Sequence, residues 1–471
     1  MALIYNGAVV EPARETPIRA RCDVAVVGGG TAGFVAALAA ARAGAQTILI
    51  EQHGSLGGAM INGATALHSF FNLYKAFPGV ERTQLVRGIP QEIVERMVAA
   101  GGCPGHVEMA EGYDYDSVAT CFDHEIFKLV SLEMLVEAGV RLLLHTATVD
   151  AVMDGAALHG VIVETKSGRE AILAKVCVDC SGDGDVAYHA GVPFRLDVDQ
   201  PQSHSVSMTF GLGNVDLPRT VDYLREHGLL SQLVRGDKGS AHDDVIRIGF
   251  NLRKNPEFER EMEAMGTWGP LSVSLHEGEL TYVNTTRVRG VNTADVEEIT
   301  RAEIALRRQA TEMAGFLKRS VPGFERSYIN WTSIQVGVRR TRTIECEYDI
   351  SSEDVEHARR FDDEIALYGF HDLAPRRMIA GGGAYGIPYR ALLPKGVENL
   401  LVAGKMITSD WTAHMSTRNT VACMAQGQAA GAAAALCVRQ QVTPRALDVT
   451  LLRQELAAAG VYLGVPALAR R

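Results

Sequence analysis

The sequence predicts an α/β protein built on a Rossmann-like nucleotide-binding unit, and two observations point to it. An apolar strand over residues 23–27 runs into a glycine-rich turn and an Ala-rich helix over 34–43, and a second apolar strand over 47–50 follows. Near the other end of the chain, an apolar strand over 399–405 precedes another Ala-rich helix over 419–438. Strands that alternate with helices are typical of a parallel sheet covered by helices.

Composition narrows the class of protein. The 471 residues are 47% hydrophobic and 22% charged, which is ordinary for globular proteins. The formal net charge of −10 disfavours sequence-independent binding to nucleic acid. We expect no membrane span, because we find no apolar run of about 18 residues, and no signal peptide over residues 1–20. The eight cysteines have no framework spacing, which favours a cytoplasmic location and gives no reason to expect a metal site.

The glycine-rich turn has the spacing G-x-G-x-x-G, formed by Gly28, Gly30 and Gly33, and Glu51 ends the second strand. The first glycine permits a sharp turn, the second leaves room for a pyrophosphate, and the third lets helix and strand pack closely. Free N–H groups at the start of the helix attract phosphates. Glu51 can accept hydrogen bonds from ribose hydroxyls. The unit therefore predicts a bound dinucleotide, with NAD and FAD both open.

Further motifs carry a resemblance to a known family. The segment from Glu51 through Leu56-Gly57-Gly58 resembles the E…G-x-L-G-G pattern of FAD-dependent oxidoreductases with the glutathione-reductase-type FAD fold. Residues 179–187 resemble that family's D-x-[ST]-G-D-G-D-x-A segment, and N-L-L-V-A-G with G-Q-A-A-G resembles its last strand and helix. The matched pieces cover most of residues 20–70, 140–195, 280–345 and 385–440. The resemblance implies FAD as the cofactor.

The same resemblance implies a Rossmann-like FAD-binding domain with an antiparallel β-meander and an inserted α+β substrate domain. We place the first part of the FAD-binding domain at residues 1–192, the substrate domain at 193–384, and the C-terminal part at 385–471. Within the substrate domain we expect strands over 205–212, 271–275, 279–283 and 335–342, and a helix over 293–319.

The resemblance further implies which residues contact FAD. They lie in the glycine-rich turns, at strand ends, in the meander and at the start of the last helix: Gly28, Gly30, Thr31, Ala32, Gly33, Glu51, Gln52, Gly57, Gly58, Val149, Gly182, Asp183, Gly404, Asn419 and Val421. Asp183 has an alternative interpretation as the cap of the helix that follows. The last helix is expected to direct its positive N-terminus at the flavin pyrimidine ring, where it stabilises the negative charge of reduced flavin.

A polar loop over 409–419 borders the flavin in this fold, and its A-H-x-S-x-R segment is similar to one in family members. We expect His414 to act as an acid or base, with a hydrogen-bonded structural histidine as the alternative. We expect Arg418 to bind an anion or face the flavin, with a structural salt bridge as the alternative.

Weaker catalytic candidates are His68, which follows the Gly57-Gly58 pair, and Tyr389. Arg339 and Arg340 are neighbours on an expected strand, so only one of them can face inward. We expect either to form a surface or interdomain salt bridge.

Several patterns are absent or incomplete. The glycines at 381–386 are followed by Pro388, which excludes the helix of a second nucleotide-binding unit. No cysteine lies between Cys22 and Cys103, where a disulfide reductase would carry its redox pair. Cys177 and Cys180 form C-x-x-C on a strand, where we expect core packing.

These features predict an FAD-dependent oxidoreductase, namely a dehydrogenase or reductase that moves a hydride between flavin N5 and a small organic substrate. One alternative is an FAD-dependent monooxygenase, because Asp183-Gly184 is similar to the D-G motif of those enzymes. A second is a non-catalytic FAD-binding or electron-carrier subunit. The expected partners are a small-molecule substrate and an external electron acceptor or donor, such as oxygen, a quinone or a protein; an oligomer is compatible with the sequence.

Overall fold

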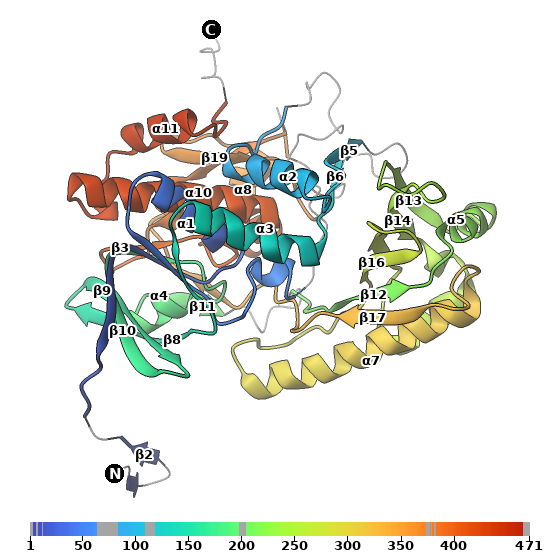
Figure 1. Ribbon diagram of the computed structural model, residues 1–471, viewed down its shortest axis with the longest axis horizontal. Coiled ribbons are helices and arrows are strands. Elements are labelled where there is room, and N and C mark those ends of the chain that lie inside the picture. The colour runs from blue at the N-terminus through green and yellow to red at the C-terminus, as the bar shows by residue number, and fades with distance from the viewer. Residues whose placement is uncertain are drawn as a thin grey trace.

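A seven-stranded mixed sheet forms the centre of the part of the chain that carries the glycine motifs (Figure 1). The computed structural model describes residues 3–5, 8–11, 13–63, 83–108, 118–196, 204–373, 377, 379–380 and 383–464. Parallel pairing joins β7 (Arg141–Leu143), β4 (Thr47–Ile50), β3 (Ile18–Val27), β10 (Gly168–Asp179) and β21 (Leu400–Val402). The expected meander is present as β8 (Ala147–Asp154), β9 (Ala157–Thr165) and β10, paired antiparallel.

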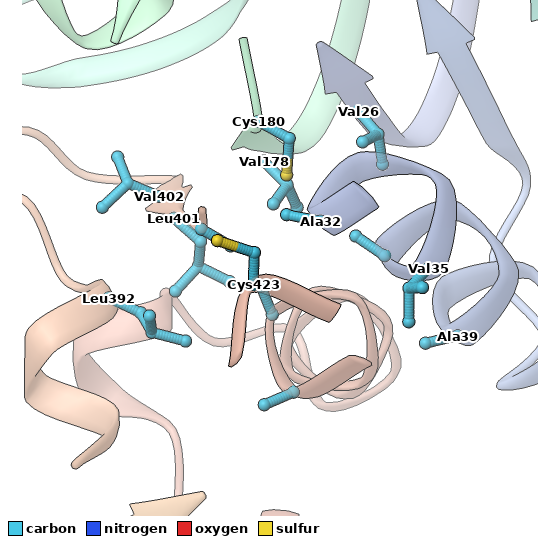
Figure 2. Close-up of a cluster of buried hydrophobic side chains, with 14 of the residues drawn as sticks. Val26, Ala32, Val35, Ala39, Val178, Cys180, Leu392, Leu401, Val402 and Cys423 are labelled. Atoms are coloured by element: carbon cyan, nitrogen blue, oxygen red, sulfur yellow. The ribbon is translucent and has the colours of Figure 1, made fainter. Parts of the chain in front are cut away.

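Helices cover this sheet. The helices α1 (Thr31–Arg42) and α10 (Thr420–Gln440) pack against each other, and α2 (Ile89–Ala99) and α3 (His124–Glu137) lie beside them (Figure 1). A Cβ atom on Gly427 or Gly431 would lie 2.1 Å from the backbone oxygen of Ala32 or Ala36. The glycines of the G-Q-A-A-G segment therefore allow two helices to touch. Figure 2 shows apolar side chains from both helices and from β3, β10 and β21 in one buried cluster.

The helix α10 corrects one expectation about composition. It is long and apolar enough to cross a membrane by length and by its mean hydropathy of 1.4, although we expected no such segment. Yet 94% of that apolar window is buried inside the protein. Its apolar character is explained by its position between α1 and the central sheet.

A second sheet of six antiparallel strands has a separate hydrophobic core. Its strand order is β13 (Leu230–Arg235), β14 (Val245–Phe250), β15 (Leu271–Val273), β16 (Glu279–Asn284), β12 (Thr209–Gly213) and β17 (Tyr328–Thr332). The long helix α7 (Val296–Ser320) lies along it, with α5 (Leu217–Glu226) and α6 (Pro256–Met265) nearby (Figure 1). In α7 the apolar residues Leu306, Met313 and Phe316 are fully buried and recur at helical spacing. This apolar stripe explains why a highly charged sequence forms a helix here.

Smaller elements complete the described chain. Two-stranded sheets pair β1 (Leu3–Tyr5) with β2 (Ala8–Val10), β5 (His106–Glu108) with β6 (Val118–Thr120), β11 (Phe194–Leu196) with β18 (Arg342–Ile344), and β19 (Glu364–Tyr368) with β20 (Tyr385–Pro388). The remaining helices are α4 (Asp185–His189), α8 (Ser352–Glu356), α9 (Trp411–Thr417) and α11 (Val449–Ala458). Several residues between 344 and 370 belong to the hydrophobic core around the seven-stranded sheet. The expected domain limits stay predictions.

Two local expectations are wrong. Residues 335–341 do not form a strand; instead Gly337 makes a single antiparallel bridge to Ser207. The expected loop over 409–419 contains α9, because the Asp410 carboxylate accepts a hydrogen bond from the Ala413 N–H and caps a short helix. Both deviations lie beside the cavity described next, where irregular backbone brings side chains from different elements together.

Candidate active site

A cavity of about 550 Å³ is lined by the loops that follow strands of the seven-stranded sheet and by residues of the second sheet. That volume is within the range of cavities that hold small ligands and cofactors. The nucleotide-binding part contributes the glycine turn, Glu51, the turn after β10 and the start of α10. The second part contributes Ser207, Thr209, Trp268, Leu271, Tyr282, Asn284 and residues 335–339.

The three glycines of the first motif have three different surroundings. Gly28 has φ +93°, and a Cβ there would lie 2.4 Å from the Cys180 backbone oxygen. A Cβ on Gly33 would lie 1.8 Å from the Gly28 oxygen, so this glycine permits close packing of α1 on β3. A Cβ on Gly30 would lie 3.8 Å from the Gly58 Cα and one on Gly58 only 2.8 Å from the Gly30 Cα, so the two backbones are in contact. Both glycines line the cavity, and together they form a cradle without side chains, of the kind that a pyrophosphate needs.

The Gly57-Gly58 pair runs beside the first motif. Gly57 forms a parallel bridge with Gly30, and its N–H donates to the Gly29 oxygen over 2.8 Å. Gly58 lines the cavity, whereas Gly57 faces Ile61 and Phe127 in the core. The two loops thus lie side by side and form one continuous cradle at the N-terminus of α1.

Glu51 is buried at the cavity wall, where one carboxylate oxygen accepts the Gly29 N–H at 2.6 Å and the other accepts the His53 N–H at 2.8 Å. Each carboxylate oxygen can accept more than one hydrogen bond. Glu51 is therefore held in place by backbone and retains acceptor capacity for ribose hydroxyls.

The turn after β10 also lines the cavity through Gly182 and Asp183. The Asp183 carboxylate accepts hydrogen bonds from Lys405 Nζ at 2.7 Å and from the Thr341 hydroxyl at 2.6 Å. The alternative that Asp183 caps the following helix is wrong: Gly184 is the N-cap of α4, and Asp179 accepts the Ala187 N–H. Asp183 instead joins the ends of β10 and β21 to the chain before β18.

The N-terminus of α10 opens onto the cavity through Asn419, Thr420 and Cys423. Asn419 is the N-cap residue, but its side-chain amide donates to the Met415 and Ser416 oxygens instead of capping the helix. The first N–H groups of α10 are therefore not capped by a side chain and can face an electron-rich group. The Gly404 N–H donates to Gln426 Oε1 at 2.8 Å, which ties the end of β21 to α10.

Arg418 lies at the end of α9 and lines the cavity with its partner Asp372. The guanidinium Nη2 makes an ion pair with the Asp372 carboxylate, while the Nε is buried without a hydrogen-bond partner among the described residues. The structure thus contains the salt bridge that we considered as an alternative, and it places that salt bridge in the cavity wall.

His414 has a different position from the one we expected. It is fully buried and does not line the described cavity. Its Nε2 donates to the Lys405 oxygen at 2.8 Å, which leaves Nδ1 to accept from His204 Nε2 at 3.1 Å. Burial and the neighbouring His204 hold the pKa of His414 well below its usual range. This position fits the alternative of a hydrogen-bonded structural histidine, and a role of His414 as acid or base stays a prediction.

The remaining candidate residues fall into those that line the cavity and those that do not. Of the fifteen expected cofactor contacts, eleven line the cavity: Gly28, Gly30, Thr31, Ala32, Glu51, Gln52, Gly58, Gly182, Asp183, Gly404 and Asn419. Within the described part of the chain, Gly33, Gly57, Val149 and Val421 are not in its wall. Tyr389 is buried elsewhere and donates to the Pro444 oxygen at 2.9 Å. His68 lies outside the described residues.

Sequence reasoning missed the cavity residues of the second sheet. Trp268, Tyr282 and Asn284 line the cavity, and Asn284 Oδ1 is buried without a hydrogen-bond partner among the described residues. Asp372 was also missed, as was the place of Arg339 in the wall. The strand that carries Asn284 was predicted, but no local signal in the sequence shows which strand faces the glycine motif.

A dinucleotide cradle that shares a cavity with a second sheet defines a nucleotide-dependent α/β protein. The profile of the FAD dependent oxidoreductase family matches residues 23–456, and the chain belongs to that family. This confirms the resemblance and identifies FAD as the cofactor. The cradle at Gly30 and Gly58, the held Glu51 and the uncapped α10 N-terminus fit the diphosphate, the ribose and the ring of FAD.

Other proteins show more limited similarity. Dihydrolipoyl dehydrogenase from Trypanosoma brucei brucei is 39% identical over 77 residues, which are 15% of this chain and 16% of that protein. A geranylgeranyl bacteriochlorophyll reductase-like protein from Thermoplasma acidophilum is 12% identical with a TM-score of 0.48, covering 93% of this chain and 82% of that one. OxyS anhydrotetracycline hydroxylase from Streptomyces rimosus is 13% identical with a TM-score of 0.43, covering 93% and 65%.

Proposed function

We propose that the protein is a dehydrogenase or reductase that transfers a hydride between flavin N5 and a small organic substrate. The observation that supports this is the cavity itself, which joins a nucleotide cradle to walls from the second sheet. A cofactor extended from the cradle to α10 would have its ring beside those walls. The second sheet then supplies the surface that a substrate contacts.

The residues of the nucleotide-binding part have separate tasks. FAD, when bound, supplies two-electron redox chemistry at its ring. Gly30 and Gly58 admit the diphosphate, while Glu51 orients the ribose. The N-terminal dipole of α10 stabilises negative charge at the nearby ring.

The substrate part of the cavity has apolar walls with a few polar groups. Trp268, Leu271 and Tyr282 exclude water from the space beside the ring. Asn284 offers an unpaired polar atom that can hold a substrate hydroxyl or amine. Arg418, oriented by Asp372, supplies positive charge. Because His414 does not line the cavity, we assign no proton transfer to its imidazole.

The test is anaerobic reduction of the purified holoenzyme by a panel of alcohols, amines and acids, followed at the visible flavin absorption. Bleaching by one class supports a dehydrogenase and identifies the substrate class. Reduction by NAD(P)H alone, followed by a peroxyflavin absorbance after oxygen is added, would replace this proposal with a monooxygenase. A protein that keeps FAD, reacts with no reductant and copurifies with a redox partner would replace it with an electron-carrier subunit.

A further inference from the structure

Arg339 is the second guanidinium in the cavity wall, and three of its five N–H donors make no hydrogen bond to the described residues. Its Nη1 donates to the Ser205 oxygen at 2.6 Å and to the Ser207 hydroxyl at 2.9 Å. Both acceptors are uncharged. Within the described residues, Nη2 and Nε make no hydrogen bond, and neither atom is among the buried unpaired ones. The Nε–Nη2 edge of Arg339 is therefore free and accessible from the cavity that this residue lines.

The charges around Arg339 do not balance. Among the described residues, the charged groups that act on it are two cations, Arg418 and Arg287, and one anion, Asp372. That anion already pairs with Arg418. Burial and the neighbouring Arg418 lower the pKa of Arg339 to about 10, so the side chain still carries its charge at neutral pH.

In the part of the chain that the structure describes, the histidine beside Arg339 adds no charge. His204 lies beside the arginines, and burial together with Arg418 lowers its pKa to about 2, so it is neutral at physiological pH. A partly desolvated cation without a counter-ion is costly in a protein interior. An anion that enters the cavity relieves that cost.

We propose that the substrate carries a carboxylate, which the free Nε–Nη2 edge of Arg339 binds in a bidentate manner. This assignment rests on the proposed function and specifies its substrate class. A carboxylate has two oxygens at the spacing of two parallel guanidinium N–H groups, and such pairs are short and strong. Ser205 and Ser207 fix the other edge of the guanidinium, so that its plane is oriented before the ligand arrives. Arg418 adds positive potential but is already engaged by Asp372.

The experiment measures binding to the oxidised holoenzyme, without turnover, from the change that each probe makes in the visible flavin spectrum. The probes are acetate, glycolate and benzoate, each compared with its uncharged amide. The variants are R339Q, which keeps N–H donors but loses the charge, and R339K, which keeps the charge but loses the two parallel N–H donors. R308Q on the exposed face of α7 is the matched loss of one positive charge. FAD content and thermal midpoint are recorded for each variant.

The wild type is expected to bind at least one of the carboxylates at least tenfold more tightly than its amide. R339Q should abolish this preference, R339K should restore part of it, and R308Q should keep it. Equal affinity for acid and amide, no binding of any carboxylate, or a preference retained in R339Q each overturns the assignment. Loss of FAD from R339Q with an unchanged thermal midpoint of its apoprotein would also overturn it, because Arg339 would then belong to the cofactor site.

These outcomes separate the two proposals. A carboxylate that binds through Arg339 while no compound bleaches the flavin supports the assignment and contradicts the dehydrogenase. Bleaching by an uncharged alcohol, with no carboxylate bound, supports the dehydrogenase and overturns the assignment.

Discussion

Replacement of Gly30 and Gly33 by alanine separates the role of the glycine motif in cofactor binding from its role in folding. Both positions receive the same methyl group, three residues apart, at the start of α1. At Gly30 the new Cβ would meet only the Gly58 Cα at 3.8 Å, and the backbone φ of −66° suits alanine. At Gly33 the new Cβ would lie 1.8 Å from the Gly28 oxygen and 2.9 Å from the Cys180 Cβ.

The structure gives different magnitudes for the two changes. Real Cβ atoms essentially never approach a heavy atom within 3.0 Å, so at Gly33 the backbone of the turn must move by more than 1 Å. Such overpacking costs about 3 kcal/mol at the upper end of its range, and the better helix propensity of alanine returns about 1 kcal/mol. We therefore expect G33A to destabilise the apoprotein by about 2 kcal/mol. At Gly30 the change in apoprotein stability should stay within about 1 kcal/mol, because no contact is broken.

For FAD affinity the order of the two effects is reversed, and G30A should be the more damaging substitution. The methyl group of G30A would cover part of the backbone surface that Gly30 and Gly58 present to the cavity, and the diphosphate would have to withdraw from it. We expect the dissociation constant for FAD to rise at least tenfold, which corresponds to about 1.4 kcal/mol. Thermal unfolding of both apoproteins, followed by titration with FAD through quenching of its fluorescence, measures the two effects. Wild-type affinity in G30A, or wild-type stability in the G33A apoprotein, would refute this account of the motif.

Three further changes test other parts of the structure. Arg418→Ala should slow anaerobic flavin reduction at least tenfold, or about 1.4 kcal/mol in the barrier, and Asp372→Asn should slow it less; equal rates in wild type and Arg418→Ala would remove Arg418 from the site. His204 and His414 stay neutral in the folded protein, so below about pH 6.5 these two side chains bind protons only in the unfolded chain. The free energy of unfolding should therefore decrease as the pH is lowered, by up to about 1.4 kcal/mol per pH unit for each histidine. In urea unfolding between about pH 5 and 7, His204→Gln should have a shallower decline, and an unchanged slope would contradict the neutral pair. Gly427→Ala should cost about 1–3 kcal/mol in denaturant unfolding, because its Cβ would lie 2.1 Å from the Ala32 oxygen; no loss would show that α1 and α10 can separate freely.

The sequence alone predicted the parts of the fold whose chemistry is local. The turn at Gly28, the packing at Gly33 and the acid at Glu51 follow one another within a single βαβ unit, so their spacing carries the information. The meander and α7 were likewise predicted, because alternation or helical spacing of apolar residues identifies them. The same reasoning failed for residues 335–341, whose apolar pattern resembles a strand although the backbone there is held by Gly337 and Arg339.

The substrate side of the cavity depends instead on contacts between distant segments. Asp372 engages Arg418 from 46 residues away, and Ser205 binds Arg339 across 134 residues. Nothing in the spacing of these residues shows that they meet. A sequence can reveal a cofactor site because one continuous loop surrounds each part of the cofactor, whereas a substrate pocket is formed by side chains that only the assembled fold brings together. The free edge of Arg339 is such a feature, and for that reason the chemistry of the substrate had to be inferred from the structure.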